Sequence, residues 1–174
     1  MNIQSAVIEG TNILNNSYIK TAKLDTEILI AKVLGSSREY VILNNHKDLN
    51  NKNLVEFKEL IKERANRKPI AYLLNKKYFW DSEFYVNKNT LIPRPDTEII
   101  IEQILRLTKY KNKLNILDIG VGSGCILLTI LKERKNFYGT GIDISKKSLD
   151  ISKINAKNLN VEERTTFYKS DIDK

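Results

Sequence analysis

The chain has 174 residues, of which 41% are hydrophobic and 29% charged, a composition ordinary for a globular protein. No apolar run approaches the roughly 20 residues that a membrane-spanning helix requires. Residues 1–4 lack the basic start and the apolar core of a signal peptide. We therefore expect a protein that neither inserts into a membrane nor carries a secretion signal.

The net charge of +8 would suit an acidic partner such as nucleic acid. The lysines are spread along the whole chain, however, and no stacking aromatic residues interleave with the densest basic segment, residues 62–68. We therefore expect no direct nucleic-acid binding. The single cysteine, Cys125, suits a reducing cytoplasm, and the single histidine, His46, is too far from it in sequence to predict a metal centre.

Residues 1–75 have the pattern of a small helical domain. Between residues 23 and 34 the apolar side chains recur every three or four positions, which predicts an amphipathic helix that ends at Gly35. Ser36 opens a capping-box pattern before the next apolar segment, and Asn53 is a candidate cap for a further helix.

Residues 76–92 change in character. Two aromatic segments, residues 78–80 and 84–86, flank the polar segment at residues 81–83. Strand-forming runs on either side of a short polar turn predict a β-hairpin. This hairpin would link the helical domain to the segment that follows.

Residues 93–174 alternate between strand and helix patterns. The expected elements are a helix that begins at Pro95, strands at residues 114–119, 137–142 and 165–169, and helices at residues 126–132 and 145–159. Strands that alternate with helices at this spacing predict βαβ units and a parallel sheet. The expected fold class is therefore α/β.

The segment that indicates chemistry is Leu-Asp-Ile-Gly-Val-Gly-Ser-Gly at residues 117–124, between the first strand and its helix. Its glycines permit a tight turn and a close approach to a ligand, and free amides at a helix start attract an anion or a polar group. The next strand ends at Asp143, whose carboxylate could accept hydrogen bonds from ribose hydroxyls. Together these features predict a site for a cofactor that carries a nucleoside.

The spacing of the loop favours one cofactor over another. Dinucleotide-binding loops prefer G-x-G-x-x-G, whose third glycine would fall here at Cys125. Asp118 instead completes D-x-G-x-G-x-G, and its carboxylate suits the ammonium group of S-adenosylmethionine, whereas it would repel the pyrophosphate of NAD. A fragment of an NAD-dependent dehydrogenase remains the less favoured alternative.

Simpler interpretations of these residues stay open. The loop could be a tight strand-to-helix turn without a ligand, and Asp118 could only cap that turn. Cys125 lies near a helix start, where the pKa of a thiol can fall and create a nucleophile. Because no histidine lies nearby to act as a base, we interpret Cys125 as a small packing residue.

Several segments resemble one family: residues 68–74, 78–80, 91–98, 117–124 and 141–143. The most distinctive is Ile-Pro-Arg-Pro-Asp-Thr-Glu within residues 91–98. The chain resembles, from about residue 60 to residue 173, the release factor glutamine methyltransferases, which are class I enzymes that use S-adenosylmethionine. One departure is Asn75, where that family usually has glycine, but asparagine tolerates the left-handed conformation that such a turn needs.

The resemblance implies an organisation and a reaction. Residues 1–75 would form a helical domain that docks the substrate, residues 76–92 a hairpin linker, and residues 93–174 part of a Rossmann-like domain that binds S-adenosyl-L-methionine. The methyl group would go to the side-chain amide nitrogen of the glutamine in the Gly-Gly-Gln motif of a peptide chain release factor, in the cytoplasm.

The resemblance also implies roles for individual residues. Cofactor binding would fall to Gly120, Val121, Gly122, Ser123, Gly124, Asp143, Asp171 and Ile172. Arg94, Thr97, Glu98 and Asp118 would lie at the border of the pocket.

One departure bears on activity. The family's catalytic segment is Asn-Pro-Pro-Tyr, but the prolines of this chain are Pro69, Pro93 and Pro95, so that segment is absent. We therefore expect the chain to be impaired in methyl transfer, or to be a non-enzymatic remnant or a subunit that binds a partner. The first strand would form a sheet edge, so we expect poor solubility or a second chain that supplies the missing strands.

Overall fold

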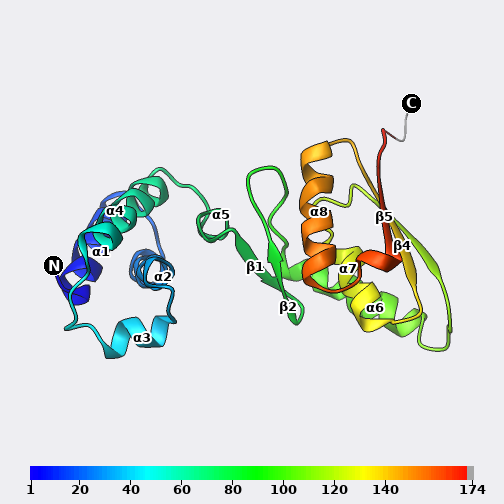
Figure 1. The fold of residues 1–174 in the computed structure, drawn as a ribbon, viewed down its shortest axis with the longest axis horizontal. Helices are drawn as coiled ribbons and strands as arrows, with labels where there is room; N and C mark the ends of the chain where they lie inside the picture. Colours follow the sequence, from blue (N-terminus) through cyan, green and yellow to red (C-terminus); the bar gives the residue numbers. More distant parts are fainter. Residues whose placement is uncertain (172–174) are drawn as a thin grey trace. The chain divides into compact units, whose positions relative to one another are not determined.

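The computed structural model describes residues 1–171 (Figure 1). The chain divides into two compact units, Met1–Leu74 and Asn75–Lys174. The first unit is helical and the second contains both β-sheets, which confirms the expected α/β class and the order of its parts. Among the described residues, no helix is both long enough and apolar enough to cross a membrane.

The first unit consists of five helices around one apolar core. They are α1 (Ile3–Asn16), α2 (Ala22–Leu34), α3 (Arg38–Leu43), α4 (Asn51–Ala65) and α5 (Ile70–Leu74). Side chains of all five meet in this core, among them the fully buried Leu14, Leu29 and Ile30. Burial of such side chains is the main driving force for folding of this unit.

The ends of these helices correct two predicted caps. Gly35 ends α2 in the left-handed conformation, with φ 59°, as the sequence indicated. Ser37, and not Ser36, caps α3, because it has the extended backbone that precedes a helix and its hydroxyl accepts from the backbone N of Tyr40. Likewise Asn50 caps α4, and the predicted cap Asn53 donates its backbone N to the Asn50 side chain at 2.8 Å.

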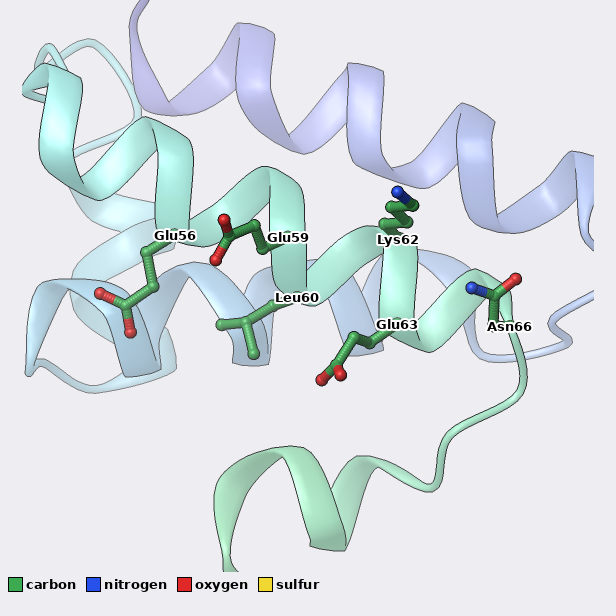
Figure 2. A pocket seen from close by; sticks show the side chains of 6 residues that line it. All are labelled: Glu56, Glu59, Leu60, Lys62, Glu63 and Asn66. Atoms are coloured by element: carbon green, nitrogen blue, oxygen red, sulfur yellow. The ribbon is translucent and has the colours of Figure 1, made fainter.

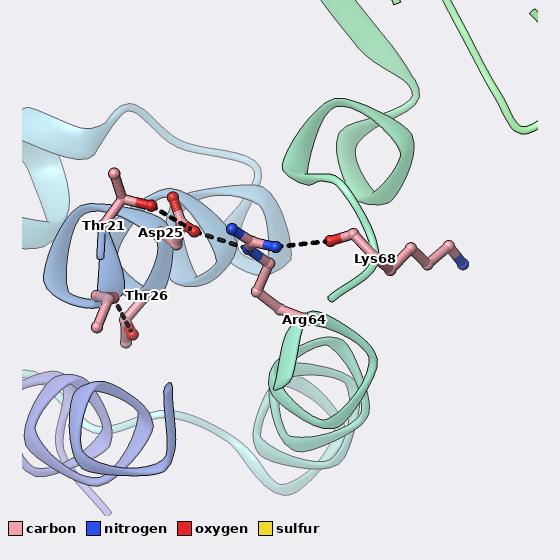
Figure 3. Close-up of polar contacts among 6 residues, drawn as sticks. Thr21, Asp25, Thr26, Arg64 and Lys68 are labelled. Atoms are coloured by element: carbon pink, nitrogen blue, oxygen red, sulfur yellow. Dashed lines mark hydrogen bonds and ion pairs between the residues drawn. The ribbon is translucent and has the colours of Figure 1, made fainter. Parts of the chain in front are cut away.

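A buried ion pair joins α2 to α4 (Figure 3). The Arg64 guanidinium lies 2.7 Å from the carboxylate of Asp25, and the two side chains are only 16% and 5% exposed. Thr21 donates its hydroxyl to the same carboxylate at 2.9 Å, and Arg64 also donates to the carbonyl of Lys68 at 3.1 Å. Both charged groups therefore have a further hydrogen-bond partner besides each other, as burial of a charge requires.

The second unit begins with the hairpin and continues with alternating helices and strands. Its elements are β1 (Lys76–Phe79), β2 (Ser82–Tyr85), a 3-10 turn (Pro95–Thr97), α6 (Glu98–Leu107), β3 (Asn115–Ile119), α7 (Cys125–Glu133), β4 (Tyr138–Asp143), α8 (Lys146–Asn158), a second 3-10 turn (Glu162–Arg164) and β5 (Thr165–Lys169). The helix expected at Pro95 therefore starts as a 3-10 turn and becomes α-helical at Glu98.

The hairpin has a tighter turn than its sequence indicated. The predicted turn at residues 81–83 is wrong, because Ser82 and Glu83 already belong to β2 and Phe79 pairs with Ser82. The connection is therefore Trp80-Asp81, with Trp80 at a φ of 56°. Phe79 and Phe84 are buried and pack edge to face with their ring centroids 6.1 Å apart, which favours this register. Asn75, just before β1, has the left-handed conformation that was expected, with φ 55°.

The larger sheet is parallel, with the strand order β3-β4-β5. Helices α6, α7 and α8 lie on one side of it (Figure 1). On that side β4 carries Gly139 and Gly141, and a Cβ atom on Gly139 would lie 2.6 Å from Leu127 of α7. The absence of a side chain at Gly139 therefore lets α7 approach β4 closely.

The opposite face of the sheet is open within the described part of the chain. β3 pairs only with β4 there, so the first strand is a sheet edge, as expected. Leu117 and Ile119 are each 59% exposed, and Tyr168 on β5 is 58% exposed. Strands of this apolar character are typical of a sheet covered on both faces.

Candidate cofactor-binding site

The loop between β3 and α7 has the conformation that its glycines allow. Gly120, Gly122 and Gly124 have φ values of 76°, 57° and 81°, a left-handed region that other residues adopt only with strain. The backbone N atoms of Gly120 and Val121 each donate to the carbonyl of Ile142 at 2.9 Å. The loop is thereby attached to the end of the neighbouring strand, β4.

Asp143 is the last residue of β4, and its carboxylate is fixed by two backbone amides. Its Oδ2 accepts from Gly122 N at 3.0 Å, and its Oδ1 accepts from Ser145 N at 2.8 Å. A carboxylate has about four lone-pair positions, so two bonds leave acceptor capacity for a ligand. The half-buried side chain is therefore positioned at the strand end before any ligand binds.

A pocket of about 340 Å³ lies at the carboxyl ends of the three parallel strands. Its lining residues come from the ends of β3, β4 and β5: Ile119, Gly120, Ile142, Asp143, Ile144, Ser170 and Asp171. In parallel α/β sheets, ligands bind at this edge. The structure thus brings together Gly120, Asp143 and Asp171, which lie far apart in the sequence; Ile172 lies outside the described residues.

The rest of the loop lies outside the lining of this pocket. Val121 and Ser123 are buried, with 4% and 3% of their surface exposed. A Cβ atom on Gly124 would lie 2.7 Å from Leu128, so this glycine permits close packing of the loop on α7. Within the loop, the pocket therefore takes its lining from Gly120, and cofactor binding by residues 121–124 stays a prediction.

Asp118 interacts with the first turn of α7. Burial raises the pKa of its carboxyl group, repulsion from the Asp143 carboxylate adds to the increase, and a hydrogen bond with the backbone of Leu127 partly offsets it. A carboxylate at a helix N-terminus is stabilised by free amides and by the helix dipole. This geometry agrees with the interpretation of Asp118 as a cap, and its charge still lies close to the cofactor loop.

The segment at residues 94–98 lies outside the lining of the pocket, and Glu98 contacts the hairpin. Arg94 is exposed, Thr97 is half-buried, and neither is among the residues that line the pocket. Glu98 accepts a hydrogen bond from the backbone N of Trp80 at 2.8 Å, and the indole N of Trp80 donates to Glu133 at 2.9 Å. Glu98 therefore attaches the strained turn of the hairpin to the start of α6.

Cys125 is the first residue of α7, and burial raises the pKa of its thiol; the charge of Asp118 adds to the increase. A thiol with a raised pKa is protonated at neutral pH and is a poor nucleophile. This agrees with the interpretation of Cys125 as a packing residue.

Two residues of α8 that the sequence did not indicate contact the loop. Ser152 donates its hydroxyl to the carbonyl of Gly122 at 2.8 Å, and Asn155 donates its side-chain amide to the carbonyl of Ser123 at 2.8 Å. Both are completely buried. The only local signal is their place on the apolar face of an amphipathic helix, where a polar side chain requires a buried partner.

The first unit has a different kind of hollow, on α4 (Figure 2). Its volume is about 530 Å³ and its lining is Glu56, Glu59, Leu60, Lys62, Glu63 and Asn66. Three glutamates and one lysine line the hollow, so this surface carries both charges with an excess of acidic groups. Within residues 1–171, no three His, Cys, Asp or Glu side chains gather as ligands for a metal ion.

Two family models match consecutive parts of the chain. A methyltransferase domain matches residues 110–174, and the PrmC N-terminal domain matches residues 5–74. The chain is 32% identical over 158 residues to the release factor glutamine methyltransferase of Caulobacter vibrioides, which covers 91% of this chain and 55% of that protein. It is 41% identical over 139 residues to the protein of the same name from Buchnera aphidicola, which covers 80% of this chain and 50% of that protein.

Among solved structures, the chain is similar to a SAM-dependent methyltransferase from Geobacter sulfurreducens in complex with S-adenosyl-L-homocysteine. The sequence identity is 32% and the TM-score is 0.38, and the match covers 45% of this chain and 30% of that protein. The second unit thus contains a region similar to a methyltransferase domain, and the glycine loop between β3 and α7 lies within it. More narrowly, the chain is similar to the release factor glutamine methyltransferases over these matched parts. It spans about half the length of the curated relatives that it matches.

Proposed function

We propose that the second unit binds S-adenosylmethionine and serves methyl transfer to the side-chain amide of a glutamine in a release factor. The observation that carries this proposal is the pocket at the carboxyl ends of β3, β4 and β5, where Gly120 lies with the carboxylates of Asp143 and Asp171. A nucleoside with two ribose hydroxyls suits a carboxylate at the end of the second strand.

Three of the lining residues have proposed roles in binding the cofactor. Asp143 would accept hydrogen bonds from the ribose hydroxyls with the acceptor capacity that its two amide partners leave. Asp171 would lie near the adenine, and Gly120 would let the cofactor approach the backbone. When bound, the cofactor supplies an activated methyl group; the chain itself binds and orients it.

The proposed substrate is a release factor, docked by the first unit in the cytoplasm. This follows the names of the relatives and the PrmC N-terminal domain at residues 5–74. The mixed charge of α4 supports a protein surface over nucleic acid as the partner, because acidic side chains there would repel phosphates. The alternative of a non-enzymatic subunit keeps this docking role without the reaction.

The carboxylates around the loop distinguish S-adenosylmethionine from NAD. Asp118 and Asp143 both lie beside it, and their charges interact with one another. A pyrophosphate would meet this negative charge, whereas the ammonium group of S-adenosylmethionine would be attracted to it. The site therefore supports the methyl donor over the dinucleotide.

The first prediction tests the cofactor by calorimetry on the full chain. We expect S-adenosylhomocysteine to bind more tightly than NAD, and Asp143→Ala to weaken this binding by about 1.5–3 kcal/mol, the value of a hydrogen bond to a charged acceptor. Asp150→Ala is the matched control, because Asp150 is an exposed carboxylate on α8. Tighter binding of NAD, or equal affinities of the two variants for S-adenosylhomocysteine, would contradict the assignment.

A further inference from the structure

Helix α8 supports the glycine loop with two completely buried polar side chains, Ser152 and Asn155. The Asn155 amide group makes three hydrogen bonds: its Oδ1 accepts from Tyr85 N at 2.7 Å, and its Nδ2 donates to the carbonyl oxygens of Tyr85 at 3.0 Å and Ser123 at 2.8 Å. Asn155 therefore links the hairpin, α8 and the loop in one network.

The loop backbone is held from two directions. Gly122 donates its amide to the Asp143 carboxylate at 3.0 Å, while its carbonyl accepts from Ser152 at 2.8 Å. The next carbonyl, that of Ser123, is held by Asn155. Two successive carbonyl oxygens are thus directed to α8, so they cannot turn their partial negative charge toward a ligand's carboxylate.

We propose that Ser152 and Asn155 are positioning residues for the cofactor: they fix the left-handed loop before the cofactor arrives. This inference rests on the proposed function. A loop that is ordered in advance does not lose conformational freedom on binding, so its contribution to affinity is greater. Asn155 also bonds to the backbone of Tyr85, so the hairpin helps to hold the loop through this side chain.

Helix α8 also offers a matched control for the test. Ser148 lies one turn before Ser152, is 5% exposed, and donates its hydroxyl to the carbonyl of Asn89 at 2.8 Å. Ser148→Ala and Ser152→Ala each remove one buried hydroxyl from the same helix, but only Ser152 reaches the glycine loop. Alanine is the best helix former, so both variants should fold.

The experiment compares the Kd for S-adenosylhomocysteine and the exchange rates of the Gly122 and Gly124 amides in the full chain and both variants. We expect Ser152→Ala to raise the Kd roughly threefold to tenfold, the effect of one neutral hydrogen bond. Both loop amides should exchange faster in that variant. Ser148→Ala should change neither quantity, although both variants should lower the urea midpoint similarly.

The outcomes separate the two proposals. If the unmodified chain does not bind S-adenosylhomocysteine, the proposed function is wrong, whereas faster exchange of the loop amides in Ser152→Ala would still support the positioning of the loop. If the unmodified chain binds and the two alanine variants have the same Kd and the same exchange rates, the positioning role is overturned. A change of Kd in Ser148→Ala equal to that in Ser152→Ala would also overturn it, because the effect would then be general destabilisation.

Discussion

Asp118 is a half-buried carboxylate, and its neighbours shift its pKa in opposite directions. Burial and the Asp143 charge raise the pKa of its carboxyl group, while its hydrogen bond with the Leu127 backbone lowers it. Since the first two effects dominate, the ionised carboxylate destabilises the folded state. Asp118 can cap the turn, attract the cofactor or do both. Stability and cofactor affinity should respond differently when its charge is removed.

The substitution Asp118→Asn keeps an acceptor for the Leu127 amide but removes the charge. Because the pKa is raised on folding, Asp118 favours the folded state at pH values below 3.8, its ordinary value, and this advantage is lost as the pH rises through the folded-state pKa. We therefore expect Asp118→Asn to raise the free energy of unfolding at neutral pH, with the gain shrinking toward pH 3.8. Urea titrations at several pH values measure it.

The same variant reports on the cofactor. A carboxylate that attracts the ammonium group would make Asp118→Asn bind S-adenosylhomocysteine more weakly while the protein becomes more stable. Unchanged affinity together with the gain in stability would identify Asp118 as a cap alone. A loss of stability at neutral pH would contradict the assigned cause of the pKa shift.

The ion pairs that join α4 to its neighbouring helices differ in burial. Arg64 and Asp25 join α4 to α2 with side chains that are 16% and 5% exposed, whereas Lys58 and Glu9 join α4 to α1 at 3.5 Å with side chains that are 52% and 40% exposed. Burial decides the effect of losing one partner, because an unpaired buried charge has no water to replace it.

We predict that Arg64→Met lowers the free energy of unfolding by roughly 3–5 kcal/mol, since it leaves Asp25 buried without its partner. Lys58→Met is the matched control, and we expect a change of about 0–1 kcal/mol from the loss of this exposed pair. Both replacements keep the aliphatic part of the side chain. Urea unfolding followed by circular dichroism measures both, and equal losses would show that burial of the first pair has little consequence.

Both the described sheet and the catalytic residues of this chain lack parts that the family resemblance leads us to expect. The described sheet has β3 at its edge and an open face on which Leu117 and Ile119 are exposed. Exposed apolar edges favour association with other chains. The sequence also lacks the Asn-Pro-Pro-Tyr segment that the family resemblance leads us to expect for orienting the glutamine amide.

We predict that the 174-residue chain by itself does not methylate glutamine at a useful rate. An amide nitrogen is a weak nucleophile, and its orientation against the methyl group can account for roughly 7–11 kcal/mol of a barrier. Incubation of the purified chain with radiolabelled S-adenosylmethionine and a release factor tests this, with an intact relative as the control. Label on the Gly-Gly-Gln glutamine at a rate near that of the relative would refute the prediction.

The sequence by itself determined the class of fold, the hairpin, the strand-to-helix loop and the juxtaposition of strand ends. These features depend on short-range information: the period of apolar residues, the glycines that permit positive φ, and the rule that parallel strands end at one edge. Gly120 and Asp143 were found in this way, because they lie at the ends of the first two strands, whereas the resemblance to a family supplied Asp171.

Only the tertiary structure decided which partners the buried polar groups have. Nothing near Ser152 and Asn155 in the sequence reveals that they hold the glycine loop, and the pairing of Glu98 with the backbone of Trp80 joins residues 18 positions apart. Helix caps and the hairpin turn were misplaced by one to three residues for the same reason. A buried donor or acceptor takes whichever partner the packing of distant elements brings within reach, and local sequence patterns do not encode that geometry.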